Sequence, residues 1–238
     1  MAEGGKMLGR VREGVAKSVK PGVTSMQLEK IACELIEATG GSPSFKMVSG
    51  YHHATCININ DVVVHGIPNN YVIAEGDKVG IDVGLFWKGF HTDTSVTVTA
   101  GQESVELKKF LDTGRRALKR AIDQAKPGKR IVDLSRAMQE TVEKDGYGIV
   151  KALTGHGIGK NLHEEPAIPC FVYDKYEHSL QLKEDMVIAI EVMYNMGTGD
   201  VAYKNNDGWT IVTADGKISG LFEHTVAVTR NGPLVLTA

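Results

Sequence analysis

The sequence predicts an α+β fold in which two similar halves pack as one domain over residues 1–238. Two segments with helical spacing of apolar residues come first, and strand-like runs follow up to about residue 99. Two more helical segments then precede a region, from Ile149 onward, that is rich in strand patterns and interrupted by glycine. This order of helices, strands, helices and strands indicates two halves of similar build.

Composition excludes several classes of protein. With 42% hydrophobic residues the chain can bury a substantial core, and its net charge of −2 lacks the basic excess of a nucleic-acid-binding protein. No run approaches the ~18 apolar residues of a membrane span, and the first residues lack the apolar region of a secretory signal. The scattered Cys33, Cys56 and Cys170 indicate free thiols in a reducing compartment. We therefore expect a cytoplasmic protein, and the low net charge is compatible with a monomer.

The first half begins with two predicted helices. The first covers about residues 3–19 and ends at a Pro-Gly pair. The second begins at Thr24, whose hydroxyl together with Gln27 fits a capping box, and it ends before Gly40-Gly41. Strands are predicted over residues 56–59 and 62–65 because both runs are rich in β-branched residues.

Residues 80–99 read as a β-hairpin whose two arms alternate apolar with polar residues. The turn is predicted at Trp87-Lys88-Gly89, with Gly89 able to adopt a positive φ. Folding about this turn brings Asp82 and Asp93 to face each other on neighbouring strands. Because two carboxylates in an apolar sheet repel, either one stays protonated or a cation lies between them.

The second half repeats the pattern. A long helix carries apolar residues from Leu107 to Ala125 and stops at Pro127-Gly128, and another is predicted over residues 131–144. The closing region contains three predicted strands, at residues 186–192, 209–213 and 222–229.

Four further segments place acidic or imidazole groups in apolar or glycine-rich surroundings. Glu191 and Glu223 lie in strand patterns that are otherwise apolar, His156 lies among glycines, and His65 ends a run of valines. Of these residues, His156, Glu191 and Glu223 together with Asp82 and Asp93 give one imidazole and four carboxylates. This oxygen-rich ligand set suits Mn²⁺, Fe²⁺, Co²⁺ or Zn²⁺ in a two-metal site. Ordinary readings remain open: an Asp beside a turn, a His within a loop, or a Glu191 that pairs with a lysine.

The motifs IDVG, HTDTSVT, TGHGIGKNLHEEP, IAIEVM and FEHTVAVT together resemble the methionine aminopeptidases of the pita-bread metallopeptidase family M24, in particular the type I subgroup. The resemblance covers nearly the whole chain. It implies a pita-bread fold, with two pseudo-symmetric halves and a curved antiparallel sheet flanked by helices. It also implies two divalent metal ions, and the residues matching the family's metal ligands are Asp82, Asp93, His156, Glu191 and Glu223.

The same resemblance assigns further roles. VVVHGIP and LHEEP carry the catalytic histidines, here His65 and His163. NDGWTIVT carries the tryptophan of the methionine pocket, and the residues matching that pocket are Tyr51, Cys56, Leu162 and Trp209. A monovalent-cation site for Na or K, formed by backbone carbonyls, maps to Asn60, Val62 and Ser219.

The resemblance implies removal of the N-terminal methionine from nascent polypeptides whose second residue is small and uncharged. In that reaction a metal-bound hydroxide attacks the methionine carbonyl, with Glu191 as base, and His65 and His163 assist. Nascent chains as substrates are consistent with work near the ribosome, although no motif indicates ribosome binding.

Two alternatives and two departures accompany this interpretation. Prolidases and Xaa-Pro aminopeptidases share the five ligands, but they carry an N-terminal domain for which the residues before His65 are too few. A non-catalytic binding module of the same fold typically loses ligands that are present here.

The departures from the family pattern are Val192, where the family usually has proline, and the loop SFKMVSGYHHATC, which differs from the usual glycine-aromatic pattern.

Overall fold

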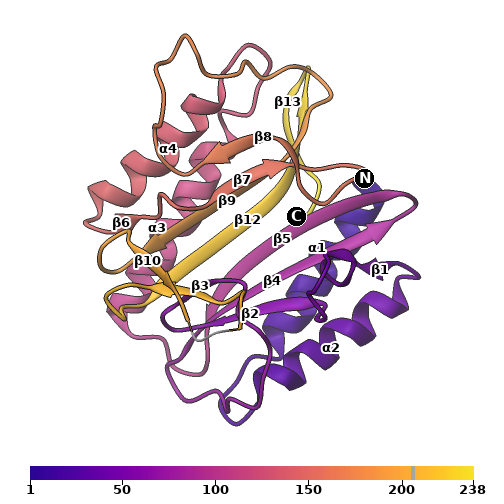
Figure 1. Cartoon of the computed structure of the whole chain (residues 1–238), viewed down its shortest axis with the longest axis vertical. Coiled ribbons are helices and arrows are strands. Elements are labelled where there is room, and N and C mark those ends of the chain that lie inside the picture. The colour runs from indigo at the N-terminus through magenta and orange to yellow at the C-terminus, as the bar shows by residue number, and fades with distance from the viewer. Residues whose placement is uncertain (205–206) are drawn as a thin grey trace.

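The computed structural model describes residues 1–204 and 207–238. Over these residues the chain forms four α-helices and a short 3₁₀ turn (Figure 1), which are α1 (Ala2–Lys17), α2 (Ser25–Ala38), η1 (Phe45–Met47), α3 (Val105–Ile122) and α4 (Ile131–Lys144). The strands of the first half are β1 (Ser42–Pro43), β2 (Thr55–Ile59), β3 (Val62–Val64), β4 (Lys78–Trp87) and β5 (Phe90–Thr99). Those of the second half are β6 (Gly148–Ile149), β7 (Thr154–Gly157), β8 (Glu164–Pro169), β9 (Val187–Asn195), β10 (Val201–Tyr203), β11 (Ile211–Thr213), β12 (Ser219–Thr229) and β13 (Gly232–Val235).

Most strands join one antiparallel sheet in the order β1-β4-β5-β12-β9-β7-β8. Strand β2 pairs with β4 at the edge of this sheet, and a smaller sheet of β10, β11 and β3 lies beside it. The long strands β4, β5, β12 and β9 run side by side through the middle of the molecule (Figure 1). Strands from the two halves of the chain therefore meet at the pairing of β5 with β12.

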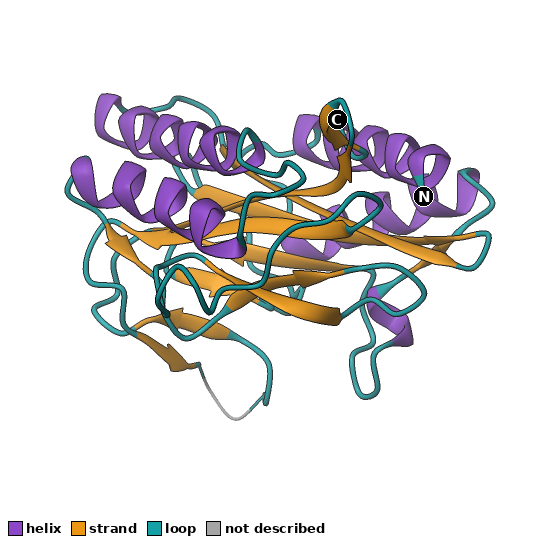
Figure 2. Ribbon diagram, turned by 90° about the horizontal axis from the view of Figure 1, so that it is seen from above, coloured by secondary structure: helices purple, strands orange, loops and turns teal. Residues whose placement is uncertain are grey.

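The four helices cover one face of the main sheet and leave the other face to strands and loops (Figure 2). Alternate residues of β4 point to the helices: Ile81, Val83 and Leu85 are buried in the same core as Leu8 of α1 and Leu28 of α2. A second core forms in the same way from α3, α4, β9 and β12. The predicted α+β class and the division into two helix-covered halves are confirmed.

Several predicted elements keep their boundaries and others shift for local reasons. The helix over residues 131–144 is confirmed at both ends, and the capping box of Thr24 and Gln27 is formed. The strand predicted over 62–65 ends at Val64 because His65 adopts a left-handed backbone with φ of 57°. The strand predicted over 209–213 begins at Ile211, because the N–H groups of Trp209 and Thr210 donate hydrogen bonds to Asp207 Oδ1 instead.

The sequence pattern missed short strands such as β7, β8 and β13. Their segments are rich in glycine or proline and carry no clear alternation, so only pairing with neighbouring strands makes them strands. Among residues 1–204 and 207–238, no helix combines the length and the apolar character that crossing a bilayer requires.

The hairpin of β4 and β5 forms, with one correction of register. Its turn is two residues long, because Lys88 and Gly89 both have positive φ, 48° and 85°, as a tight hairpin turn requires. The prediction that Asp82 and Asp93 lie close together on neighbouring strands is confirmed, but the prediction that they face each other across the ladder is wrong. Asp82 lies opposite Ser95, and Asp93 lies two residues before Ser95 on β5, so the two carboxylates are diagonal neighbours on one face.

Threonine hydroxyls join the two halves where β5 meets β12. The Thr225 hydroxyl donates to the Asp93 carbonyl at 2.7 Å and accepts from the Asp93 N–H at 2.9 Å. Thr97 forms a similar pair of bonds with the backbone of Leu221, and the Thr94 hydroxyl donates to the Glu223 carbonyl at 2.8 Å. These side chains supply hydrogen bonds where the regular ladder between the two strands is short.

We expect Thr225→Val to lower the free energy of unfolding by about 1–3 kcal/mol, because it keeps the shape of the side chain but leaves two buried backbone groups of Asp93 without this partner. Urea unfolding followed by circular dichroism measures the change. Thr99→Val is the matched control, because the Thr99 hydroxyl bonds only an exposed carboxylate. Equal stability of the two variants would contradict the role assigned to Thr225.

Candidate metal centre and active site

The register of the sheet aligns acidic side chains from both halves in one row. Cys56 of β2 pairs with Asp82 of β4, Asp82 pairs with Ser95 of β5, Ser95 pairs with Glu223 of β12, and Glu223 pairs with Glu191 of β9. Residues directly opposite each other in an antiparallel sheet point to the same side. The row therefore projects from the face that the helices leave uncovered.

Asp93 and His156 reach the same place from neighbouring positions. Asp93 is two residues from Ser95 on β5, and His156 of β7 lies opposite Ala189, two residues from Glu191 on β9. One ligating atom each of Asp93, His156 and Glu223 lies within 4.8 Å of the others. The five residues that the sequence singled out as ligands thus line one cavity.

The glycines around His156 allow β7 to approach β9 closely. A Cβ atom at Gly155 would lie 2.5 Å from the Ala189 carbonyl oxygen, so only glycine fits there without displacement. His156 Nδ1 lies 2.9 Å from the Gly157 carbonyl oxygen, and because a carbonyl can only accept, Nδ1 carries the proton. Nε2 therefore keeps a free lone pair, which is what a metal ion requires.

Burial shapes the electrostatics of the site. It raises the pKa of Asp82 to about 7 and the pKa of Asp93, Glu191 and Glu223 well above the usual range of carboxyl groups. Repulsion from neighbouring carboxylates raises the last three pKa values further. Burial also lowers the pKa of His156 to about 4, so its ring is neutral at pH 7.

These residues fit divalent metal ions. Asp82 Oδ1 and Ser95 Oγ are buried and have no hydrogen-bond partner among the described residues. Four carboxylates converge there without a lysine or arginine ion pair among those residues, which is costly unless protons or cations compensate the charge. Carboxylate oxygens with one neutral imidazole are ligands for Mn²⁺, Fe²⁺, Co²⁺ or Zn²⁺.

The cavity above the row has a volume of about 120 Å³, and both predicted catalytic histidines line it. His163 lies against His156, with ring centroids 4.5 Å apart, and His65 lies 6.4 Å from the Trp209 ring. Burial lowers the pKa of both His65 and His163. Each is therefore a neutral imidazole at pH 7 that can donate one hydrogen bond.

Apolar side chains form the rest of the cavity wall. The predicted pocket residues all line it, and these are Tyr51, Cys56, Leu162 and Trp209. Tyr51 contacts Trp209 edge to face at 5.0 Å, and its hydroxyl donates to the Thr55 carbonyl at 2.8 Å. Burial raises the pKa of the Cys56 thiol well above its ordinary value, so Cys56 contributes a neutral wall rather than a nucleophile.

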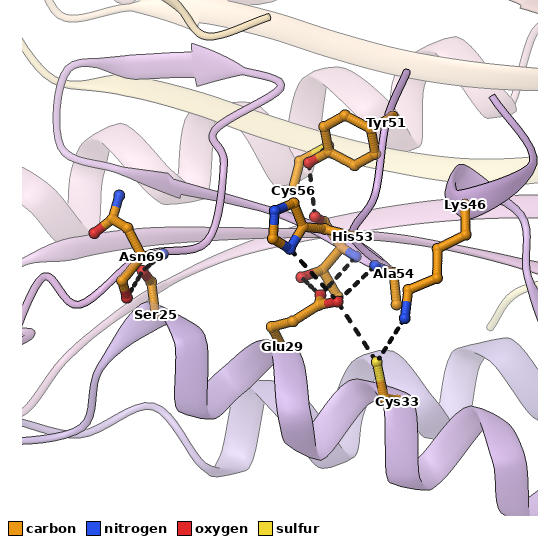
Figure 3. Close-up of polar contacts among 10 residues, drawn as sticks. Ser25, Glu29, Cys33, Lys46, Tyr51, His53, Ala54, Cys56 and Asn69 are labelled. Carbon is orange, nitrogen blue, oxygen red and sulfur yellow. Dashed lines mark hydrogen bonds and ion pairs between the residues drawn. The ribbon is translucent and has the colours of Figure 1, made fainter. Parts of the chain in front are cut away.

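Sequence reasoning missed several residues of this site. Phe45, Val48 and Val64 line the cavity, and no pattern in the sequence marks them as pocket residues. Glu29 of α2 is buried below the pocket and accepts hydrogen bonds from the N–H groups of Ala54 (2.7 Å) and Thr55 (3.0 Å), as well as from the Thr55 hydroxyl (2.7 Å; Figure 3). It thereby anchors the start of β2 directly beside Cys56. An acid next to the apolar stripe of α2 was its only signal in the sequence.

The three residues predicted to bind a monovalent cation are not part of this cavity lining. Asn60 lies in the turn between β2 and β3, Val62 begins β3, and Ser219 begins β12. The Asn60 carbonyl accepts a hydrogen bond from the Ser219 N–H at 3.0 Å. The Val62 carbonyl accepts one from Lys78 Nζ at 3.0 Å. Their role as a Na or K site stays a prediction.

Comparison with known proteins agrees with this geometry. Residues 1–230 match the model of metallopeptidase family M24. A methionine aminopeptidase of Aquifex aeolicus is 43% identical, over 94% of this chain and 89% of its own length, and methionine aminopeptidase 1 of Bacillus subtilis is 38% identical, over 100% and 94%. The crystal structure of methionine aminopeptidase from Thermotoga maritima superposes with a TM-score of 0.95 at 38% identity, covering 100% of this chain and 94% of that one.

The fold and the acidic site thus define a metallopeptidase, and the chain belongs to metallopeptidase family M24. Its curated relatives of high coverage within that family are methionine aminopeptidases. The pita-bread fold is confirmed by the same structural match. A prolidase of Pyrococcus furiosus shares the fold, with a TM-score of 0.80 at 24% identity, and this chain covers 62% of it.

We expect the metal-free protein to lose stability as pH rises from about 6.5 to 8.5. The folded state holds protons on carboxyl groups whose pKa is raised, whereas the unfolded state has already released them, and each excess proton costs about 1.4 kcal/mol per pH unit. The lowered pKa of His156 acts in the opposite sense, but only below about pH 6.5. Above pH 7 the lowered pKa of Lys78, about 7, offsets one of the excess protons, and the remaining carboxyl groups still give a net decline.

Thermal unfolding of chelator-treated protein across this pH series measures the effect. Added Mn²⁺ should remove the decline, because bound cations replace the protons. A melting temperature that stays constant or rises with pH in the absence of metal would contradict the predicted protonation.

We expect Glu29→Gln to destabilise the protein by about 1–3 kcal/mol and to raise the KM for substrates, because an amide nitrogen would face backbone N–H groups at the start of β2. Urea unfolding and steady-state kinetics measure the two effects. Glu34→Gln on the same helix is the control, since Glu34 forms only an exposed pair with Lys30. A loss of stability as large in Glu34→Gln would argue against a specific anchor at Glu29.

Proposed function

We propose that this protein removes the N-terminal methionine from polypeptides whose second residue is small and uncharged. The observation that carries this proposal is the convergence of four carboxylates and one imidazole at a cavity of about 120 Å³ whose other wall is apolar. Such a cavity accommodates one unbranched apolar side chain beside a charged centre. The full-length similarity to methionine aminopeptidases supports the same assignment.

The residues proposed as ligands of two divalent ions are Asp82, Asp93, His156, Glu191 and Glu223, and the donor set accepts Co, Mn, Fe or Zn. When bound, such ions supply a Lewis acid and an activated water for hydrolysis of the peptide bond. Asp93 and Glu223 are buried among the strands, whereas Asp82 and Glu191 are partly open to the cavity. The open pair is therefore the one that reaches the reacting atoms.

Three side chains around the cavity are proposed to transfer or donate protons during the reaction. Glu191 is proposed to accept the proton of the attacking water, because its carboxylate lines the cavity and is partly open to it. His163 is proposed to donate its N–H to the carbonyl oxygen as negative charge develops there. His65 is proposed to assist protonation of the leaving nitrogen.

Binding selectivity is assigned to the apolar wall. Tyr51, Cys56 and Trp209 are proposed to surround the methionine side chain, with Leu162 beside them. Glu29 and the Tyr51 hydroxyl hold this wall through backbone contacts at Ala54 and Thr55. A rigid wall favours a flexible, unbranched side chain over branched ones of similar volume.

We further propose that residues 1–238 act as a single catalytic domain, as a cytoplasmic monomer on nascent polypeptide N-termini. Because the proposed substrates are nascent chains, we propose that the enzyme acts near the ribosome, which requires no nucleic-acid-binding motif.

We expect release of methionine from Met-Ala-Ser but not from Met-Lys-Ser, with Mn²⁺, Fe²⁺, Co²⁺ or Zn²⁺ supplied separately. Glu191→Gln should lower kcat by about 10²- to 10⁴-fold, because the proton acceptor is lost. Glu184→Gln is the control, since Glu184 forms only an exposed pair with Arg230. Chromatographic detection of free methionine measures both effects.

Two outcomes would contradict the proposal. Release of Xaa from Xaa-Pro dipeptides, with no release from Met-Ala-Ser, would indicate prolidase-like specificity instead. Metal analysis that finds no divalent ion after reconstitution would indicate a non-catalytic binding module.

A further inference from the structure

Lys78 is a buried lysine at the first position of β4, and only 1% of the residue's surface is exposed. Its Nζ donates hydrogen bonds to the backbone carbonyl oxygens of Asn58 and Val62, both at 3.0 Å. These two carbonyls belong to β2 and β3, the strands on either side of the Asn60-Asp61 turn. One side chain therefore joins three strands.

The surroundings of Nζ are carbonyl oxygens rather than a carboxylate. No acidic oxygen of the described residues lies within 4.0 Å of it, and Lys204, not Lys78, forms the ion pair with Asp61. Burial lowers the pKa of Lys78 to about 7, and the more distant Asp61 opposes that shift. Backbone carbonyls that converge on a small cation are the arrangement proteins use for monovalent ions.

The segment that Lys78 holds carries His65. Val62 lies three residues before it, and Gly66 follows it directly. The Gly66 N–H donates to Asn58 Oδ1 at 2.9 Å, and the Asn58 carbonyl is one of the two that Lys78 binds. The chain on both sides of His65 is thus tied to the same ammonium group, directly at Val62 and through Asn58 at Gly66.

We propose that Lys78 is a positioning residue: its ammonium group acts as a built-in monovalent cation for the carbonyls of the β2–β3 turn and so fixes His65 beside the cavity. The Lys78 side chain then takes the place of a dissolved Na or K ion at the Val62 carbonyl. The consequence for His65 rests on the proposed function, whereas the cation role of Lys78 does not.

Two variants separate the effect of the Lys78 charge from the effect of its packing. Lys78→Ala removes the ammonium and leaves space that a small cation can enter, whereas Lys78→Met fills the same space without charge. Both are assayed in choline chloride, potassium chloride and methylammonium chloride at equal ionic strength. The readouts are the thermal unfolding midpoint and, on Met-Ala-Ser, kcat and KM separately.

We expect the wild-type midpoint and activity to be the same in all three salts. Lys78→Ala should lose about tenfold to a hundredfold in kcat in choline, with a smaller change in KM, because His65 is displaced while the apolar wall is intact. Potassium or methylammonium should restore part of both the midpoint and kcat. Lys78→Met should show a similar loss without this recovery, and Lys204→Ala, which removes the solvent-side lysine at the same turn, should behave as wild type.

Three results would overturn the proposal. These are wild-type protein that needs potassium or methylammonium for full stability, Lys78→Ala that neither cation restores, and Lys78→Ala that is fully active in choline. If Lys78→Ala is unfolded in choline, refolding in potassium or methylammonium supports the proposal, and failure to refold in either overturns it. Wild-type protein without any release of methionine counts against the proposed function alone, because the thermal readout does not depend on it.

Discussion

The feature on which the structure depends is the enclosure of like charges across its four central strands. Asp82, Asp93, Glu223 and Glu191 come from β4, β5, β12 and β9, and they project from one face of a continuous sheet. Their mutual repulsion, together with burial, would oppose folding if all four were ionised and uncompensated. The fold therefore requires positive charge, as protons or as metal ions, at the junction of its two halves.

The rest of the molecule is arranged around that junction. The helices cover only the opposite face of the sheet (Figure 2). Ile81 and Val83 of β4 therefore point into the core, whereas Asp82 between them lines the cavity on the other face. The hydroxyls of Thr94, Thr97 and Thr225 join β5 to β12 where the backbone ladder is short. The two halves of the site therefore join at this pair of strands, which carries Asp93 and Glu223.

Two further buried charges fix the walls of the cavity from the first half of the chain. Glu29 binds backbone N–H groups at the start of β2, beside Cys56 (Figure 3), and Lys78 binds backbone carbonyls at the end of β2 and in β3. The Glu29 carboxylate accepts hydrogen bonds from backbone N–H groups, and the Lys78 ammonium donates to backbone carbonyls, so backbone groups compensate each charge. In this way loops without regular pairing keep a defined position next to the acidic row.

The sequence by itself determined the α+β class, the four helices, the long strands and the acidic and histidine residues that line the cavity. Periodicity is a local property, and an acid within an apolar strand is conspicuous in one dimension. Only the tertiary structure decided the register, which makes Asp82 and Asp93 diagonal rather than opposite and places Glu191 directly across from Glu223. It also decided the roles of Phe45, Glu29 and Lys78, because their partners are cavity atoms or backbone groups that no pattern in the sequence marks. Hydrogen bonds to the backbone depend on where the chain passes, and that is a property of the whole fold.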